Sequence, residues 1–419
     1  MADKKLIFMI SDLILFPSGV GTQTRYVVDA LIKTGKYRVM QFGGAIKHQN
    51  YQPIKVQEYG DDFIAFPVDG YGTQDMVRSV IRQNKPDMLW FMTDPRFYEW
   101  LWMMEEEIRP QVPMVYYHVW DNYPYPKFND KYYKSNDFIA CISKVTHDIV
   151  KTVSPEVECE YVPHAVDTDI FAPLSPDTIK NLRLKNFGPK GNDKFVIFWN
   201  NRNARRKQSG SLVYWYSKFV EKVGKDKVLL VMHTEPKDPE GQDLEALSEE
   251  FGLSPDNFLI SRTKLPPKDL AALYGICDCT VNISDAEGFG LATLESLSCG
   301  VPIVVNMTGG LQEQVTDGKD WFGVGIEPAS KALIGMQQGA LYIYEDRVSE
   351  KDFVDALMSL YNTPKDKRKL MGEKGRQHVL NNYNFDKFNK QWIDIVDRVI
   401  EKHGSWPTKN YKSHQLIEL

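Results

Sequence analysis

The sequence has few cysteines, no long hydrophobic run and no excess of positive charge, and each shortage excludes a class of protein. Lys4 and Lys5 resemble the start of a signal peptide, but the apolar run after them breaks at Ser11 and no cleavage site follows. A membrane-spanning helix needs ~20 apolar residues, and the longest runs are far shorter: Leu6–Ile10, Trp100–Met104 and Cys279–Ile283. We therefore expect no transmembrane segment and a cytoplasmic protein.

The cysteines are too few for a disulfide framework in a chain of this length. There are 5 in 419 residues, and most of them lie inside apolar stretches, so we expect reduced, buried thiols. Cys277 and Cys279 are separated by a single residue, which is not the spacing of a zinc-binding pair, and no histidine cluster lies nearby. We expect neither disulfides nor zinc.

Positive charge is in short supply only in the first part of the chain. The net charge is −5, and residues 1–171 carry 18 lysines and arginines against 23 aspartates and glutamates. An acidic surface repels phosphate backbones and anionic lipid headgroups. Nucleic acid and membranes are therefore disfavoured as partners, although a local basic groove is not excluded.

Apolar residues make up 42% and charged residues 26% of the chain, which is ordinary for a soluble globular protein. Short apolar runs alternate with longer amphipathic ones, and this alternation predicts βαβ units with parallel sheets. The expected strands in the first half are Leu6–Ile10, Arg38–Phe42, Asp87–Met92, Pro113–Val119, Phe138–Ile142 and Cys159–Val162. Those in the second half are Lys194–Asn200, Val228–His233, Asn257–Ile260, Cys279–Ile283 and Val301–Val305.

The alternation stops between Pro173-Leu174-Ser175-Pro176 and Gly188-Pro189-Lys190-Gly191, which indicates a domain boundary between about residues 171 and 193. From Glu350 to near Lys402 the pattern is almost wholly helical. We expect an α/β protein with two doubly wound Rossmann-like domains facing each other across a cleft. Ligands in such folds bind at the carboxyl ends of the strands.

The strongest local signal is a glycine-containing loop between an expected strand and a helix that begins near Leu291. Glycines let the backbone approach a ligand closely, and a helix N-terminus offers free N–H groups, so this loop suits a phosphate. Glu287 in the loop and Glu295 one turn into the helix suit the hydroxyls of a sugar or ribose. The alternative is that both glutamates are ordinary solvated acids.

A basic loop follows the first strand of the second domain. Its sequence, Asn201-Arg202-Asn203-Ala204-Arg205-Arg206-Lys207-Gln208, crowds cations at the carboxyl end of that strand. Two such cations can neutralise a diphosphate and stabilise its charge as it leaves. A solvated basic loop or a nucleic-acid patch is the alternative.

These residues resemble the retaining glycosyltransferases of family 4, which have the GT-B fold. Glu287 and Glu295 match the family's E-x7-E signature, and Arg202 and Lys207 match its diphosphate-binding pair. Further similarity follows along residues 4–402, in three segments: Pro17-Ser18-Gly19-Val20-Gly21, Pro163-His164-Ala165-Val166-Asp167 and Gly309-Gly310-Leu311-Gln312-Glu313. Ala165 stands where the family more often has glycine.

The resemblance implies a domain layout. Residues 1–171 would form the acceptor-side domain, 172–193 a linker and 194–384 the nucleotide-sugar-binding domain. A helix over 385–402 would cross back to the first domain, and 403–419 would be a tail.

It also implies roles for single residues. Glu295 would hold the donor ribose and Glu287 the transferred sugar, while Arg202 and Lys207 hold the diphosphate. Backbone groups of the two glycine loops would contact the donor; the residues concerned are Gly19, Gly21, Gly288, Phe289, Gly290, Leu291 and Ala292. His118 would lie near the donor sugar, whereas a histidine ending an apolar strand is by itself more often structural. The family's chemistry retains anomeric configuration without a confirmed enzyme nucleophile, so we assign none.

Three other features have competing interpretations. Asp167-Thr168-Asp169 has the spacing of a metal-binding triplet, but the family's equivalent stretch binds no metal, and we expect no metal or other cofactor. Trp100–Met104 suits membrane docking or core packing, and the acidic run 105–107 favours packing. The aromatic residues around His118 suit an acceptor platform or a buried strand; they are Tyr116, Tyr117, Trp120, Tyr123 and Tyr125.

The sequence thus predicts a retaining, metal-independent glycosyltransferase with a GDP- or UDP-linked donor and a glycan or other hydroxyl acceptor. Four alternatives stay open: a sugar-nucleotide epimerase, a phosphorylase, an enzyme that glycosylates modified nucleic acid bases, and a non-catalytic nucleotide-sugar binding module. The sugar, the base, the acceptor and the oligomeric state are not predicted.

Overall fold

The computed structural model describes residues 4–123, 125–337 and 340–411. The chain divides into two compact units. Unit 1 comprises residues 1–165, 335–342 and 385–419, and unit 2 comprises residues 166–334 and 343–384. Residues 1–3 of the expected first domain and 412–419 of the expected tail lie outside the described residues.

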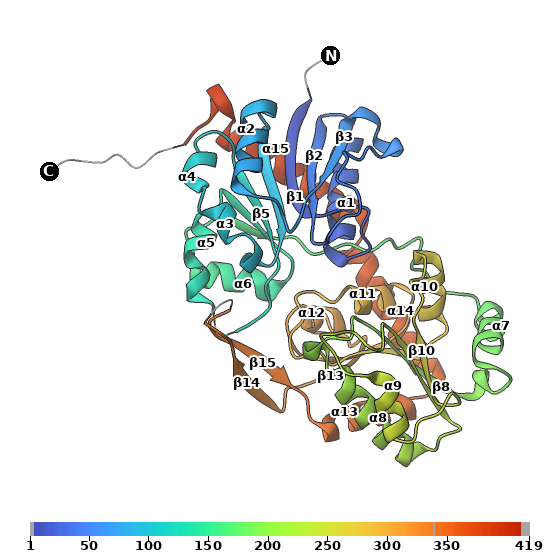
Figure 1. Ribbon diagram of the computed structural model, residues 1–419. Helices are drawn as coiled ribbons and strands as arrows, with labels where there is room; N and C mark the ends of the chain where they lie inside the picture. The colour runs from blue at the N-terminus through green and yellow to red at the C-terminus, as the bar shows by residue number, and fades with distance from the viewer. Residues whose placement is uncertain (1–3, 124, 338–339, 412–419) are drawn as a thin grey trace. The chain divides into compact units, whose positions relative to one another are not determined.

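Unit 1 contains a seven-stranded parallel sheet in the order β3-β2-β1-β4-β5-β6-β7 (Figure 1). Its strands are β1 (Lys5–Asp12), β2 (Tyr37–Gly44), β3 (Phe63–Pro67), β4 (Met88–Thr93), β5 (Met114–His118), β6 (Phe138–Cys141) and β7 (Cys159–Tyr161). Its helices are α1 (Gly19–Lys33), α2 (Gln74–Asn84), α3 (Glu99–Trp102), α4 (Glu105–Ile108), α5 (Asp130–Lys134), α6 (Lys144–Val153) and α15 (Phe385–His403). Short 3-10 turns lie at Gln57–Asp62, Pro95–Phe97, Lys127–Asn129 and Trp406–Thr408.

Unit 2 contains a six-stranded parallel sheet in the order β10-β9-β8-β11-β12-β13. Its strands are β8 (Phe195–Asn200), β9 (Val228–His233), β10 (Phe258–Ser261), β11 (Cys279–Asn282), β12 (Ile303–Asn306) and β13 (Gly323–Ile326). Its helices are α7 (Pro176–Phe187), α8 (Ser209–Val223), α9 (Leu244–Glu250), α10 (Pro267–Gly275), α11 (Leu291–Ser298), α12 (Leu311–Val315), α13 (Glu350–Asn362) and α14 (Lys365–Asn382). Short 3-10 turns lie at Gly191–Asp193 and Arg205–Lys207.

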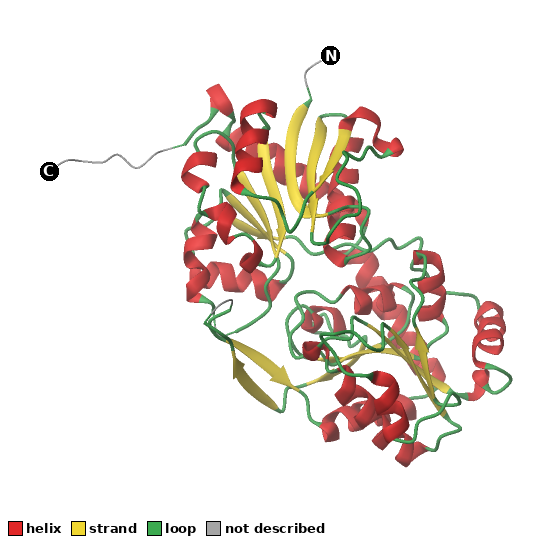
Figure 2. Cartoon of the chain, viewed as in Figure 1, coloured by secondary structure: helices red, strands yellow, loops and turns green. Residues whose placement is uncertain are grey.

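Each sheet is buried because helices cover both of its faces (Figure 2). This explains why the strands are continuous apolar runs rather than alternating ones: β4 and β5 are buried throughout, as is β11. The strand order of each sheet reverses once, between β1 and β4 in unit 1 and between β8 and β11 in unit 2. The expected α/β fold with two doubly wound domains is confirmed.

A separate antiparallel hairpin interrupts unit 2 between β13 and α13. It consists of β14 (Ser330–Ile334) and β15 (Ile343–Arg347), which pair with each other and form a ribbon apart from the main sheet (Figure 1). The sequence patterns predicted neither this hairpin nor β3 and β13. The strands of the hairpin are short and partly polar, so they lack the buried apolar run that marks the strands of the two main sheets.

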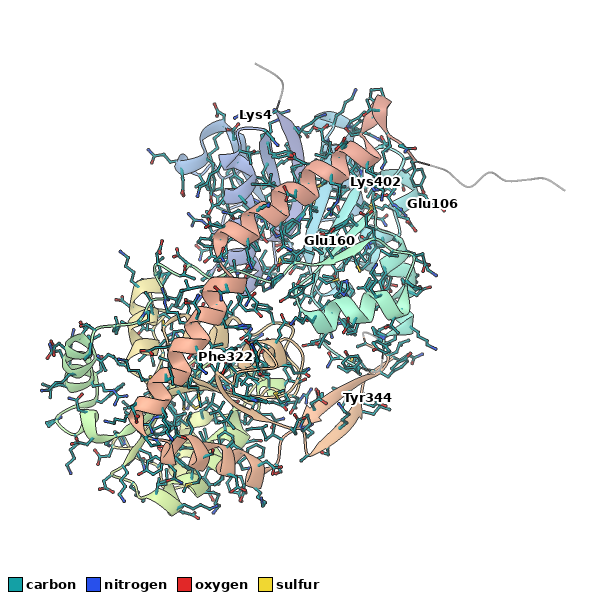
Figure 3. The ribbon with its side chains drawn as sticks, turned by 180° about the vertical axis from the view of Figure 1, so that it is seen from behind. Lys4, Glu106, Glu160, Phe322, Tyr344 and Lys402 are labelled. Atoms are coloured by element: carbon teal, nitrogen blue, oxygen red, sulfur yellow. The ribbon has the colours of Figure 1, made fainter. Side chains whose placement is uncertain are left out.

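The helix α15 packs on unit 1, and Figure 3 shows it lying across the strands of that unit. Trp392 on α15 is fully buried, and its ring contacts those of Trp90 and Tyr117. Lys402 and Arg398 extend the contact with ion pairs to Glu158 and Glu160, respectively.

Two segments differ from their expected form. The stretch expected to be a linker contains the helix α7, whose N-cap is Ser175 and whose first residue is Pro176, a combination that starts helices efficiently. Residues 403–411 of the expected tail dock on unit 1. Ser405 donates a hydrogen bond to Asp87, and the indole of Trp406 donates one to the carbonyl of Pro86.

The cysteines and hydrophobic runs behave as expected. All five thiols are free and buried. Within the described ranges, no helix combines the length and the apolar character that crossing a membrane requires. The Trp100–Met104 stretch is core-facing at Leu101, Trp102 and Met104, and only Met103 is strongly exposed.

Candidate active site

The point where the strand order of unit 2 reverses lies between β8 and β11. The chain leaves these neighbouring strands in opposite directions, so the loops at their carboxyl ends open a crevice, which is where doubly wound sheets bind ligands. The loop after β8 carries the basic segment 201–208, and the loop after β11 carries the glycine segment 283–290. The two strongest sequence signals therefore meet at one place in the fold.

Lys207 and Glu287 form an ion pair at this crevice. Lys207 ends a 3-10 turn before α8, Glu287 lies in the loop before α11, and both side chains are about nine-tenths buried. The amide of Asn282 donates a second, longer hydrogen bond to the Glu287 carboxylate, at 3.4 Å. The pair couples residues 80 positions apart in the sequence.

The charges around Glu287 keep it ionised. Burial opposes ionisation, but the positive charges of Lys207 and Arg206 outweigh it and hold the pKa of the Glu287 carboxyl below its usual value. Arg206 is itself anchored, because its guanidinium donates to the carbonyl oxygen of Ala286 at 2.7 Å. A buried ammonium and a buried carboxylate are thus available together for a ligand that carries both phosphate and hydroxyl groups.

Arg202, at the start of the basic loop, pairs with a different acid. Its guanidinium forms a bidentate ion pair with Asp238, with N–O distances of 2.7 and 2.9 Å, and 64% of its side chain is exposed. In the structure Arg202 is thus paired with Asp238, and its expected role at a diphosphate stays a prediction. The sequence did not single out Asp238, since nothing in the pattern distinguishes it from the other acids of the polar stretch 235–243.

Glu295 is placed by a buried tyrosine. The hydroxyl of Tyr274, on α10, donates to Glu295 at 2.9 Å and accepts from the amide of Asn200 at 2.8 Å. Burial raises the pKa of the Glu295 carboxyl to about 7, and the Tyr274 hydrogen bond only partly offsets this. Asn200 ends β8, so the hydrogen-bonded series of three side chains runs from the carboxyl end of that strand to α11.

The glycine loop is tightly packed. Gly290 is the N-cap of α11 with φ = 92°, a conformation that favours glycine. The amide of Gly310 donates to the carbonyl of Glu287 at 3.0 Å, and a Cβ at Gly310 would lie 2.7 Å from backbone atoms of Gly288 and Phe289. Leu291 and Ala292 form the first turn of α11, next to these residues.

The glycines of unit 1 also begin a helix. Ser18 is the N-cap of α1, which starts at Gly19, and its hydroxyl accepts from the amide of Gly21. A Cβ at Gly21 would lie 2.7 Å from the carbonyl oxygen of Phe16, so the turn requires glycine there. A donor contact at Gly19 or Gly21 stays a prediction.

His118 ends β5 and is fully buried. Its two ring nitrogens lie within hydrogen-bond distance of the hydroxyls of Tyr116 (3.2 Å) and Tyr133 (2.9 Å). Burial lowers the pKa of the His118 imidazole to about 3, so the ring is neutral at physiological pH. This environment suits a structural histidine, and a role near the donor sugar stays a prediction.

The aromatic residues around His118 are mostly core. Tyr116 and Tyr117 are fully buried and Trp120 is nearly so, whereas Tyr125 is 38% exposed. The buried-strand interpretation therefore holds for Tyr116 and Tyr117, which lie on β5, while Trp120 is buried but follows the strand.

Asp167 is engaged locally. Its carboxylate accepts from the backbone amides of Asp169 (3.1 Å) and Ile170 (3.0 Å), which makes it a turn cap. In the part of the chain that the structure describes, no cluster of three or more His, Cys, Asp or Glu side chains is arranged to hold a metal ion.

Comparison with known proteins bears on this part of the chain. Residues 183–378 match the family model "Glycosyl transferases group 1". The matched segment holds both loops of the crevice and every site residue of unit 2 described above.

Two curated relatives match a similar length. A GDP-mannose-dependent alpha-(1-6)-phosphatidylinositol monomannoside mannosyltransferase of Mycolicibacterium smegmatis is 27% identical over 191 residues, or 44% of this chain and 47% of that protein. A D-inositol 3-phosphate glycosyltransferase of Corynebacterium urealyticum is 31% identical over 166 residues, or 39% of this chain and 31% of that protein. The matches thus span less than half of either relative.

Solved structures extend the likeness to the whole chain. Sucrose-phosphate synthase from Thermosynechococcus elongatus has a TM-score of 0.75 at 15% identity, covering 95% of this chain and all of that one. Anabaena HepE in complex with UDP and glucose has a TM-score of 0.67 at 15% identity, covering 94% of this chain and all of that one. At such identities the likeness shows the fold, and the expected GT-B fold class is confirmed.

Proposed function

We propose that the protein is a glycosyltransferase that moves a sugar from a nucleoside diphosphate donor to a hydroxyl acceptor. The observation that carries this proposal is the buried Lys207–Glu287 ion pair at the β8/β11 crevice. An ammonium suits the diphosphate and a carboxylate suits the hydroxyls of the sugar beside it. The family match over residues 183–378 supports the same reaction class.

The geometry suggests how the pair works. Lys207 pairs with the bound diphosphate. Its positive charge stabilises the negative charge that develops as the leaving group departs. Glu287 then loses part of its contact with Lys207 and accepts hydrogen bonds from the transferred sugar. Glu295, held by Tyr274, accepts from the ribose. We assign no nucleophile, and we propose retention of anomeric configuration on the resemblance alone.

A GDP- or UDP-linked donor fits two comparisons. One relative is named for its dependence on GDP-mannose, and HepE is described in complex with UDP and glucose. A glycan or another hydroxyl compound is the proposed acceptor. We further propose that neither a metal nor a cofactor is needed, because Lys207 and Arg206 already supply positive charge, and that the protein is cytoplasmic, as its free thiols suggest.

The test is nucleoside diphosphate release from a panel of UDP-, GDP-, ADP- and dTDP-sugars in EDTA, with and without candidate hydroxyl acceptors. We expect one donor to release its nucleoside diphosphate, and an acceptor to raise the rate. Epimerised donor without release, or release of sugar 1-phosphate only with inorganic phosphate, would replace the proposal with an epimerase or a phosphorylase. Binding without turnover of any donor would leave a binding module, and turnover only after Mn²⁺ or Mg²⁺ is added would contradict metal independence.

A further inference from the structure

The hairpin β14–β15 lies within an unusually long connection between a strand and a helix. The connection from β13 to α13 runs over residues 327–349, whereas connections between strands and helices in α/β units are typically about 2–6 residues long. A two-stranded hairpin is only marginally stable on its own in water. Its structure must therefore be supported by contacts at its ends.

The base of the hairpin meets the crevice loops through three consecutive residues of β15. Glu345 binds the guanidinium of Arg205, on the Lys207 loop, with one N–O distance of 3.0 Å. Asp346 accepts from the hydroxyl of Thr308 at 2.7 Å, on the loop that holds Gly310. Arg347 lies 3.3 Å from the carboxylate of Asp285, two residues before Glu287.

These contacts form one network of alternating charge, in which the carboxylates are buried and the arginines are partly exposed. Glu345 bridges Arg205 and Arg347, and Asp285 also accepts from the amide of Gln208 at 2.6 Å. The carboxylates of Glu345 and Asp285 are 2% and 1% exposed. A buried carboxylate that loses its cation is strongly penalised, so each member holds the others in place.

Backbone hydrogen bonds add a second link. The amide of Asp346 donates to the carbonyl of Asp285 at 2.8 Å, and the amide of Asp285 donates to the carbonyl of Arg206, also at 2.8 Å. The side-chain amide of Asn306 also donates to the backbone carbonyl of Asp346, at 2.8 Å. The loops of Lys207, Glu287 and Gly310 are therefore joined to one another through β15.

We propose that Glu345 and Arg347 are positioning residues: they hold the loops that carry Lys207 and Glu287 in the geometry that the reaction needs. The inference rests on the proposed function for its catalytic consequence, but its structural part does not. Neither side chain needs to touch the donor. The hairpin is thus part of the active-site framework of this chain rather than a surface decoration.

Hydrogen exchange of the backbone amides tests the structural part without any substrate. Glu345→Gln and Arg347→Gln should each speed exchange in segments 204–208, 284–290 and 306–310 about tenfold relative to wild type. Lys351→Gln is the matched control, since Lys351 is 81% exposed on the adjacent α13 and forms its ion pair with Asp355, one turn along the same helix. Unchanged exchange in all three segments would overturn the proposal.

Kinetics tests the catalytic part. Arg347→Gln should lower kcat/KM about tenfold, and Arg347→Lys, which keeps the cation, should recover much of the loss. In a Glu287→Gln background the same Arg347→Gln change should lower kcat/KM less than about threefold. The effects of substituting residues that act through one another are not additive. Full additivity with Glu287→Gln would contradict positioning and indicate a merely structural role.

The two failures are distinguishable. If wild type turns over no nucleotide sugar, the proposed function fails, while the exchange experiment still decides whether β15 holds the loops. If wild type is active and the variants exchange and react like the Lys351→Gln control, only the inference about the hairpin is wrong.

Discussion

At the scale of single residues, the two glutamates of the E-x7-E spacing have opposite surroundings. Glu287 is ionised beside Lys207, whereas burial raises the pKa of Glu295 to about 7. One carboxylate is paired with a cation and the other with a neutral hydroxyl. This difference predicts different effects of the same substitution.

Glu287→Gln should lower kcat, because its proposed contact with the transferred sugar would matter as charge develops. Glu295→Gln should mainly raise KM, because a ribose contact is made equally in ground and transition states. Steady-state kinetics of both variants on the same donor check this. Identical profiles for the two variants would mean that their roles have been divided wrongly.

The raised pKa of Glu295 also predicts a pH dependence. Donor affinity should weaken as pH falls through about 7, since a protonated carboxyl accepts hydrogen bonds from the ribose poorly. Tyr274→Phe removes a hydrogen bond that lowers this pKa, so the midpoint should move to higher pH. Donor affinity of both proteins measured from pH 5.5 to 8.5 checks the shift, and Tyr214→Phe, on α8 at 37% exposure, is the control.

The same group affects stability with a definite sign. The folded pKa of Glu295 lies above its ordinary value of 4.5, so the folded state binds more protons between pH 4.5 and 7 and loses stability as pH rises through that window. Glu295→Gln removes this penalty. We expect the variant to be stabilised by on the order of 2 kcal/mol at pH 8 and little changed at pH 4. Thermal unfolding at the two pH values checks it, and equal shifts at both would be the contrary result.

At the scale of elements, the crevice depends on loops that only glycine permits. Gly310→Ala places a Cβ against backbone that cannot move aside, whereas Gly318, at φ = 88°, has no atom within 4 Å of the added Cβ. Gly318→Ala should therefore cost only the backbone strain of about 1–2 kcal/mol. Gly310→Ala should cost more than that and abolish activity. Chemical denaturation of both variants, with donor turnover, compares them.

Elements with a buried apolar run were predictable from sequence, and most expected strands lie within a few residues of the observed ones. The helix α11 begins at Leu291, where a helix was expected. The hairpin and its network were not predictable, because Glu345 lies 140 positions from its partner Arg205, and Glu345 and Arg347 look like solvated charges in the sequence. Tyr274 and Asn200 were missed for the same reason, since only the fold brings them to Glu295.

At the scale of the whole molecule, α15 belongs to unit 1 although it follows the residues of unit 2 in the sequence. Trp392→Ala should destabilise unit 1 by about 3–5 kcal/mol, because a fully buried indole leaves a large cavity. Trp321→Ala in unit 2, where the ring is 49% exposed, is the matched control and should change stability little. Calorimetry of the two variants checks the difference, and similar losses in both would argue against the packing role of α15.

The fold class followed from the strand–helix alternation, while the position of the site within unit 2 followed from the strand order. Sequence alone placed Arg202 and Lys207 together, but the structure pairs Arg202 with Asp238 and Lys207 with Glu287. A loop's composition does not determine where each of its side chains points. Which acid each cation pairs with was therefore not predictable from the sequence.

The central claim is that the β8/β11 crevice binds a nucleoside diphosphate through Lys207. Isothermal titration of GDP and UDP in EDTA, into wild type, Lys207→Ala and the control Lys218→Ala, a half-buried lysine on α8, tests it most directly. We predict that one nucleotide binds wild type and the control equally and binds Lys207→Ala at least about thirtyfold more weakly, which corresponds to about 2 kcal/mol. Equal affinity of all three proteins for the nucleotide would contradict the account.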